Sequence, residues 1–293
     1  MNSVSLWIKA VRPYAYSASV VPIAIGGFHA RLVAPPAFSW LRFGVALAGG
    51  ILIHTAANLW NDYYDFRDGV DRKGAGEGSG VLVHGEMTPA ACFRGAVISA
   101  MLAALAGLFL IWQVGWSLLA LLVAGLFGAW AYSAGPLSPK HRALGEIWVF
   151  LLMGAGMTLG GHMAQTGRFS WGAIVTGIPA GLLMTLLLFV NNLRDLESDR
   201  QAGLHTLPMR FSLATNKGLT AILLLLPFLM ATAMAFSRWL PLAILLALLT
   251  LPTALRWLAR IWKTPIDNSD VMKVAMLHMG FGLLFAAGLW IGR

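Results

Sequence analysis

Two short stretches of the sequence gather acidic side chains in a chain that has few charges. NDYYDFRDGVD, residues 61–71, contains four of the chain's 12 acidic residues, and NNLRDLESD, residues 191–199, contains three more. Carboxylates this close together repel each other unless a cation neutralises them. Mg²⁺ suits such a place, because it is held by hard oxygen ligands and keeps room for water and phosphate oxygens. The two stretches therefore predict a site for divalent cations.

The spacing in the first stretch brings its polar side chains together if the preceding helix continues. Asn61, Asp65 and Asp68 follow one another at i, i+4 and i+7 and so share a helical face. Gly69 is expected to end that helix, and Asp71 would then reach back from the loop. The first stretch thus offers an amide and up to three carboxylates to one ligand.

The second stretch repeats this arrangement. Asn191, Asp195 and Asp199 follow at intervals of four residues on one face, whereas Glu197 is turned away by about half a turn. Because the same Asn-led pattern occurs twice, we favour metal binding over the alternative that these are solvated charges that merely cap helices.

Basic side chains are interleaved with the acids. Arg67, Arg72 and Lys73 belong to the first region, and Arg194 and Arg200 belong to the second. A metal ion, carboxylates and arginines together describe a site for a diphosphate. We therefore expect these five side chains to bind the diphosphate.

Other candidates for chemistry are weaker. Cys92 is the only cysteine and has no partner for a disulfide or a metal site. The glycines at 74, 76, 78 and 80 resemble a phosphate-binding loop, but no strand is expected before them and the Lys-Ser/Thr ending is missing. His54 and His278 lie in apolar segments, where a single histidine is usually a hydrogen-bonded packing residue.

The elements that carry the acidic stretches must be membrane helices. The 293 residues are 58% hydrophobic with a mean hydropathy of +0.72, and only 11% of them are charged, whereas about a quarter are charged in a soluble domain. Apolar runs of about 20 residues, the length that crosses a bilayer, recur along the chain. We predict an all-α polytopic membrane protein, one domain over 1–293, with about nine spans near 14–33, 41–60, 92–112, 116–133, 145–164, 172–191, 217–236, 239–258 and 271–291.

The basic residues predict the orientation of these spans. With the N-terminus in the cytoplasm, 16 of the 21 Lys and Arg residues fall on the cytoplasmic side, together with all 12 acidic residues. The net charge of +9 is thereby explained by loops between spans, and nucleic acid is not expected as a partner. We expect a multi-pass protein of the cell inner or plasma membrane whose active site faces the cytoplasm.

The paired motifs resemble those of the UbiA superfamily of intramembrane prenyltransferases. The spacing Asn61-x3-Asp65-x5-Asp71 is similar to the 1,4-dihydroxy-2-naphthoate polyprenyltransferase (MenA-like) branch. The resemblance continues through VRPYAYSASVVPIAIG (11–26), VLVHGEMTP (81–89), YSAGPLSPKHRALGE (132–146), GGHMAQTG (160–167) and DRQAGLHTL (199–207). The sequence departs from this branch at Gly80, Leu204 and His205, where basic residues are common. The resemblance implies a helical bundle with a central cavity and cytoplasmic cap loops.

The resemblance also implies roles for individual residues. Two Mg²⁺ ions would be held by Asn61, Asp65, Asp71, Asn191, Asp195 and Asp199, of which Asp65, Asp195 and Asp199 are expected to be catalytic. Arg194, Tyr132 and Lys140 match residues near the diphosphate. We assign Arg12, Arg142 and His162, which lie in matching segments, to the acceptor.

These features predict Mg²⁺-dependent transfer of a polyprenyl group from its diphosphate to a lipid-soluble aromatic acceptor, in contact with membrane lipid. The branch favours 1,4-dihydroxy-2-naphthoate, in menaquinone biosynthesis. The alternatives are the same chemistry on 4-hydroxybenzoate, homogentisate or a lipid alcohol. A transporter is a more remote alternative, because transporters bind their substrates near the bilayer midplane and both clusters here are expected at one membrane surface.

Overall fold

The computed structural model describes residues 3–73, 78–135 and 138–292, and within these ranges it contains helices and no strand. The α-helices are α1 (Ser3–Val11), α2 (Ser17–Val33), α3 (Trp40–Arg67), α4 (Pro89–Val114), α5 (Leu119–Ala131), α6 (Gly145–Val149), α7 (Met157–Thr166), α8 (Trp171–Arg194), α9 (Leu196–Gln201), α10 (Leu213–Phe236), α11 (Leu251–Lys263) and α12 (Asn268–Ile291). A π-helical segment (Phe150–Gly156) joins α6 to α7, and a 3₁₀ segment (Leu242–Thr250) leads into α11. The all-helical prediction is confirmed.

The number of spans differs from the expected nine. Among the described residues, seven helical stretches are long and apolar enough to cross a membrane: 40–67, 89–114, 145–166, 171–194, 213–236, 242–263 and 268–291. The first and fourth expected spans correspond to shorter helices. These are α2, with 17 residues, and the apolar stretch 116–131. A count of nine is therefore not confirmed, although every expected span corresponds to a helix.

Local sequence signals set the helix ends. Ser39, Thr88, Ser170 and Ser212 each precede a long helix and accept a hydrogen bond from the backbone N–H three residues later. At the other end of α3, Gly69 follows the last helical turn with a φ of 75°, a left-handed conformation that favours glycine. The expected helix stop at Gly69 is confirmed.

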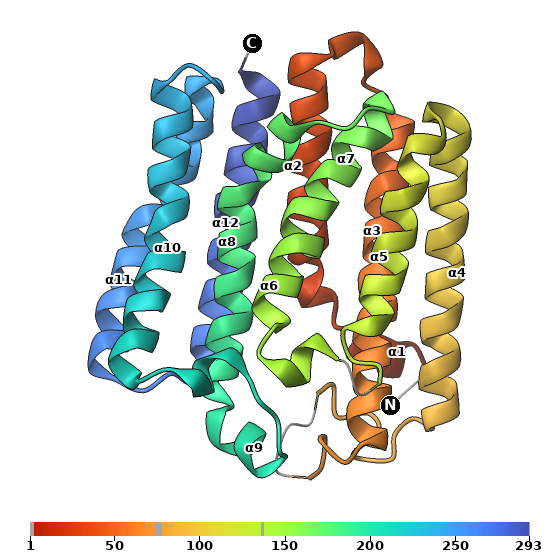
Figure 1. The fold of residues 1–293 in the computed structure, drawn as a ribbon, viewed down its shortest axis with the longest axis vertical. Coiled ribbons are helices and arrows are strands. Elements are labelled where there is room, and N and C mark those ends of the chain that lie inside the picture. Colours follow the sequence, from red (N-terminus) through yellow and green to blue (C-terminus); the bar gives the residue numbers. More distant parts are fainter. Residues whose placement is uncertain (1–2, 74–77, 136–137, 293) are drawn as a thin grey trace.

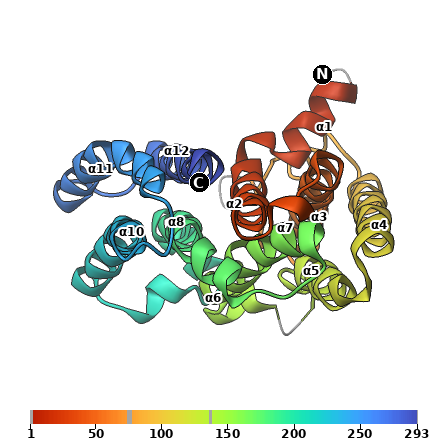
Figure 2. The same cartoon turned by 90° about the horizontal axis from the view of Figure 1, so that it is seen from above.

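The helices pack into one bundle with the two motif-bearing helices on different sides of it. The helices α3 and α8 lie on either side of the pair α2 and α7 (Figure 2). Glycines let α2 and α7 approach closely, because a side chain on Gly26 would collide with the backbone of Thr158 and one on Gly161 with the backbone of Ile23. The largest apolar core lies among α2, α8, α10, α11 and α12 and includes Phe281.

One end of the bundle collects the segments that matter for function. The last turns of α3 and α8 and the residues that follow them, 61–71 and 191–204, lie at the same end as α1, whereas the C-terminus lies at the other end (Figure 1). We call this end the motif end. The chain thus brings together two motifs that are about 130 positions apart in the sequence, counted from Asn61 to Asn191.

Candidate active site

A cavity of about 900 Å³ opens inside the bundle and is polar at the motif end. Its polar lining includes all six predicted metal ligands and four basic or phenolic side chains: Asn61, Asp65, Asp71, Asn191, Asp195, Asp199, Arg12, Tyr132, Lys140 and Arg194. Deeper in the bundle the lining is apolar, with glycines and aliphatic side chains such as Gly50, Ile53, Gly107 and Leu122. The two motifs therefore face one shared space.

The first motif centres on Asp65, which is buried near the end of α3. The Lys140 ammonium and the Asn61 amide both donate to Asp65 Oδ2, and His141 Nε2 lies 3.8 Å from Oδ1. Lys140 comes from the loop between α5 and α6. The negative charge of Asp65 is thus balanced by a cation from a distant segment.

The chain folds back after α3 and brings Asp71 beside Asp65. The backbone N–H groups of Val70 and Asp71 donate to the carbonyl oxygen of Asp65 at 2.8 and 3.1 Å. Burial, and next the charge of Asp65, raise the pKa of Asp71 to about 8. Two carboxylates in such an arrangement, where the charge of one raises the pKa of the other, form a favourable place for a divalent cation, because the cation would relieve their repulsion.

Asp62 joins two other segments to the first motif. Arg12 Nη2 donates to Asp62 Oδ1 at 2.7 Å and to the carbonyl oxygen of Asn58 at 3.0 Å, and the hydroxyl of Ser79 donates to Asp62 Oδ2. Ser79 belongs to the loop of residues 78–88, which we call the cap loop. An ion pair at 2.8 Å between Lys9 of α1 and Glu86 joins the cap loop to α1 directly.

The second motif is almost a continuous helix. Asp195 separates α8 from α9, yet its N–H still donates to the carbonyl oxygen of Asn191 at 3.1 Å. Arg194 pairs with the Asp195 carboxylate and donates to Asn191 Oδ1 at 3.0 Å. Burial and then the neighbouring Asp195 raise the pKa of Asp199 to about 6. Glu197 is turned away and pairs with Arg200 at 3.3 Å, as its place on the helix predicts.

The two motifs suit a metal that shares its ligands with a substrate. Among the described residues, no group of three or more His, Cys, Asp or Glu side chains is arranged to hold a metal ion alone. Mg²⁺ usually takes one or two carboxylates and completes its shell with water and substrate phosphates. Pairs such as Asp65 with Asp71 and Asp195 with Asp199, each beside an asparagine, fit that requirement.

Several predicted site residues lie outside the cavity lining. Arg67, Arg72, Lys73 and Arg200 are exposed, and Arg67 pairs with Asp68 at 2.7 Å. Asp68 caps the end of α3 and does not join the face formed by Asn61 and Asp65.

Two of the three predicted acceptor residues also lie outside the lining. Arg142 is exposed. His162 is buried, and its Nδ1 lies 3.2 Å from Nδ1 of His29. Arg12, the third, lines the cavity, but its guanidinium donates a hydrogen bond to the Asp62 carboxylate.

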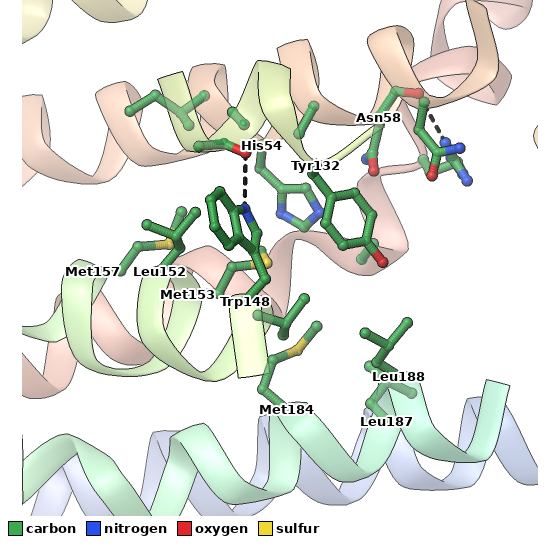
Figure 3. A pocket seen from close by; sticks show the side chains of 18 of the residues that line it. His54, Asn58, Tyr132, Trp148, Leu152, Met153, Met157, Met184, Leu187 and Leu188 are labelled. Carbon is green, nitrogen blue, oxygen red and sulfur yellow. Dashed lines mark hydrogen bonds between the residues drawn. The ribbon is translucent and has the colours of Figure 1, made fainter. Parts of the chain in front are cut away.

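Side chains in the middle of the cavity include three that sequence reasoning missed. His54, Asn58 and Trp148 point into it between the motif end and the apolar part, together with the predicted Tyr132 (Figure 3). Ser19 Oγ lies 2.9 Å from His54 Nδ1, and Trp148 Nε1 donates to the carbonyl oxygen of Gly128 at 3.0 Å. The signal for His54 was its position seven residues before Asn61, which places both side chains on one face of α3.

Sequence comparison places this site in a known family. The model of the UbiA prenyltransferase family matches residues 19–287, most of the chain and all of both motifs. The chain belongs to the UbiA prenyltransferase family. It is therefore a prenyltransferase by family, and the predicted resemblance to UbiA proteins is confirmed.

Individual UbiA relatives cover most of the chain. The chicken (Gallus gallus) UbiA prenyltransferase domain-containing protein 1 is 31% identical over 288 residues, which are 97% of this chain and 84% of that protein. The 1,4-dihydroxy-2-naphthoate octaprenyltransferase of Bacillus subtilis is 30% identical over 219 residues, 74% of this chain and 68% of that enzyme.

A solved UbiA structure shares the fold. The structure of a UbiA homolog from Archaeoglobus fulgidus bound to GPP and Mg²⁺ matches with a TM-score of 0.69, covers 96% of this chain and 99% of that one, and is 16% identical. The helix arrangement described above is therefore the UbiA fold.

Proposed function

We propose that this chain transfers a polyprenyl group from its diphosphate to 1,4-dihydroxy-2-naphthoate in an Mg²⁺-dependent reaction. The observation that carries the proposal is the shape of the cavity, in which both Asn–Asp motifs face one space that is polar at the motif end and apolar beyond it. A polyprenyl diphosphate has the same division, with a charged head and a long apolar tail.

The polar end of the cavity holds the head of the substrate in this proposal. Asn61, Asp65, Asp71, Asn191, Asp195 and Asp199 would hold two Mg²⁺ ions, which supply the positive charge that makes diphosphate a better leaving group. Lys140 and Arg194 face the same space and can donate charge-assisted hydrogen bonds to phosphate oxygens. We assign them this role ahead of Arg67, Arg72, Lys73 and Arg200, which lie outside the lining.

The remainder of the cavity protects the reacting carbon from water. Breaking the C–O bond leaves an allylic cation, which water would quench, so the reaction requires a dry environment. Aliphatic and glycine residues of α3, α4 and α5, including Ile53, Gly107 and Leu122, provide this environment and the path for the tail. The electron-rich ring of the acceptor then attacks the cation through a ring carbon, which loses its proton, or its carboxyl group as CO₂, to restore the aromatic ring. No covalent enzyme intermediate is required.

Two observations support the naphthoate as the acceptor. The spacing Asn61-x3-Asp65-x5-Asp71 is similar to the 1,4-dihydroxy-2-naphthoate branch, and a relative that bears that name is 30% identical to this chain. An aromatic acceptor would fit beside His54, Tyr132 and Trp148, which project into the middle of the cavity (Figure 3). His54 projects into the middle of the cavity near Trp148 and Met153, and we propose that it hydrogen-bonds a hydroxyl of the acceptor.

Membership of the UbiA family and the seven long apolar helical stretches in the described part of the chain make this an integral membrane protein. We propose further that the motif end faces the cytoplasm, because the basic residues are concentrated in the loops on that side. Water-soluble diphosphate, the product of the reaction, would then be released into the cytoplasm.

The test is an acceptor screen with purified protein in detergent. Polyprenyl diphosphate and Mg²⁺ are incubated with 1,4-dihydroxy-2-naphthoate, 4-hydroxybenzoate, homogentisate or a lipid alcohol, and products are identified by mass spectrometry together with released diphosphate. We expect prenylation of the naphthoate that disappears with EDTA and in the Asp65→Asn and Asp195→Asn variants. Preference for another acceptor would make the naphthoate assignment wrong. Absence of diphosphate release with all four would reject the prenyltransferase proposal for these substrates.

A further inference from the structure

A second, smaller hollow lies outside the active-site cavity, between α11 and α12. It has a volume of about 300 Å³, and its lining includes three basic side chains and an apolar floor: Arg256, Arg260, Lys273, Trp257, Val274 and Leu277. The helices meet here where α11 ends and α12 begins, at the motif end of the bundle (Figure 1). We call this hollow the α11–α12 groove. It shares no lining residue with the active-site cavity.

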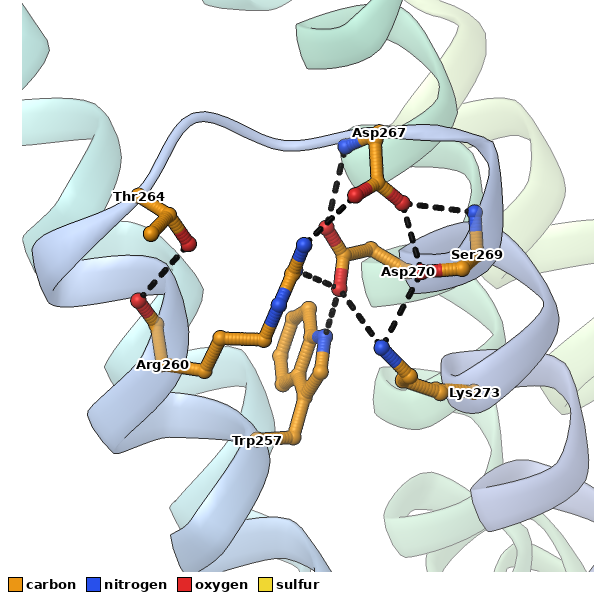
Figure 4. A network of polar contacts seen from close by, with 7 residues as sticks. All are labelled: Trp257, Arg260, Thr264, Asp267, Ser269, Asp270 and Lys273. Carbon is orange, nitrogen blue, oxygen red and sulfur yellow. Dashed lines mark hydrogen bonds and ion pairs between the residues drawn. The ribbon is translucent and has the colours of Figure 1, made fainter.

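A buried carboxylate fixes the geometry of the groove. Asp270 is fully buried, and its Oδ1 accepts from Trp257 Nε1 at 3.0 Å and from Arg260 Nη1, with Lys273 Nζ 3.6 Å away (Figure 4). Asp267 pairs with Arg260 Nη2 at 2.5 Å and caps α12. These contacts hold the cationic side chains of both helices in place before any ligand binds, which reduces the entropy that binding costs.

The groove carries more positive than negative charge. The described stretch 251–277 contains Arg256, Arg260, Lys263 and Lys273 but only two carboxylates, Asp267 and Asp270. Both carboxylates are engaged with Arg260. Arg256 is exposed and makes no ion pair among the described residues. An anion that enters the groove would therefore meet a positive charge that the protein itself leaves unbalanced.

The surroundings of the groove indicate what kind of anion it takes. Arg256 lies one turn, about 6 Å, deeper along α11 than Arg260, so the cations extend into the apolar part of the helix. Leu255 and Met276 on the same two helices are exposed, at 47% and 60%, as side chains that face lipid are. A ligand that fits these surroundings combines an anionic head with an apolar tail that lies along Val274 and Leu277.

We propose that the α11–α12 groove binds the phosphate headgroup of an anionic membrane phospholipid. Basic pockets between membrane helices recognise such headgroups, and an arginine beside a lysine can donate several charge-assisted hydrogen bonds to phosphate oxygens. The bound lipid would brace α11 against α12. This binding is separate from prenyl transfer and does not depend on the acceptor.

The test compares the melting temperature of the full chain in nanodiscs of phosphatidylcholine with and without phosphatidylglycerol. We expect phosphatidylglycerol to raise the melting temperature of the unaltered chain, and Arg256→Gln and Lys273→Gln each to lose at least half of that rise. Both side chains are exposed, so the variants should fold. Arg94→Gln is the matched control, because Arg94 is exposed at the motif end on α4, away from the groove (Figure 2), and it should keep the full rise.

Two results would overturn the proposal. An equal loss in Arg94→Gln would show diffuse attraction between the lipid surface and any arginine at this end. The same rise on adding inorganic phosphate to phosphatidylcholine nanodiscs would show a free-phosphate site instead of a lipid site. Native mass spectrometry of the detergent-purified protein provides a second readout, in which Arg256→Gln should retain less phosphatidylglycerol than Arg94→Gln.

Discussion

Gly78 brings the backbone of the cap loop against the first motif. Its φ is 56°, and a Cβ at this position would lie 2.6 Å from Asp71 Oδ2 and 2.8 Å from Asp62 Oδ1. The backbone of Gly78 therefore lies so close to the two carboxylates that no residue with a Cβ atom would fit at this position. We predict that Gly78→Ala displaces these carboxylates and lowers prenyl transfer at least tenfold.

Gly69→Ala separates this effect from backbone strain. Gly69 also has a positive φ, 75°, but no atom lies within 4 Å of its Cβ position. Both variants should lose about 1 kcal/mol of stability from the left-handed conformation, whereas only Gly78→Ala should lose activity. Melting temperatures and turnover at saturating Mg²⁺ measure the two effects. Equal turnover in both variants would show that the approach of Gly78 is unimportant for the reaction.

At the residue scale, the sequence predicted contacts within a helix and missed those between segments. The intervals of four residues place Asn61 with Asp65 and Asn191 with Asp195, as the structure shows. The pair between Arg12 and Asp62 joins residues 50 positions apart, and such a pair depends on how α1 packs against α3. No local pattern reports that packing.

At the scale of elements, the short helix α9 directs one face toward the cavity and the other toward solvent. Asp199 lines the cavity, whereas the Glu197 side chain is 72% exposed and pairs with Arg200 and Gln201. An exposed pair of this kind contributes roughly 0–1 kcal/mol. We therefore predict that Glu197→Gln keeps most of the activity and its dependence on Mg²⁺, and that Asp199→Asn loses both.

The measurement is turnover against Mg²⁺ concentration for the two variants, which each change one carboxylate to its amide. Similar damage from both substitutions would mean that the segment turns differently when substrate is bound. The assignment of metal ligands by helical face would then be incorrect.

Element boundaries show why spans are harder to predict than motifs. The stretch 145–166 reads as one continuous apolar helix, but a π-helical segment interrupts it at 150–156, beside Gly181 of α8. The interruption depends on a neighbouring helix, because Gly154 and Gly181 approach each other there. Hydropathy reports the length and composition of an apolar segment. It contains no information on which neighbouring helix that segment will pack against.

At the scale of the whole molecule, the basic residues predict which end of the bundle faces the cytoplasm. The fold alone does not determine this orientation. Lys73 lies in the loop after α3, and Arg168 lies at the opposite end, between α7 and α8. Both are exposed, and the native Cys92 is fully buried. We predict that an impermeant thiol reagent added to intact cells labels Arg168→Cys and leaves Lys73→Cys unlabelled.

The same reagent applied to broken cells should label both variants, and the unaltered chain should remain unlabelled in either condition. Labelling of Lys73→Cys alone in intact cells would invert the orientation. Position 168 is preferable to the adjacent Gly167, because a side chain on Gly167 would meet the backbone of Val114.

The pairing of Asp65 with Lys140 has a consequence for how the chain is made. The two residues are 75 positions apart, and at 5–20 residues per second a ribosome needs roughly 4 to 15 seconds to add that length. During this interval the carboxylate lacks Lys140, and we expect it to remain hydrated, because an unpaired charge is costly to bury. We therefore expect the last turns of α3 to settle only after α4 and α5 have been inserted, so that the motif end is the last part of the active site to form.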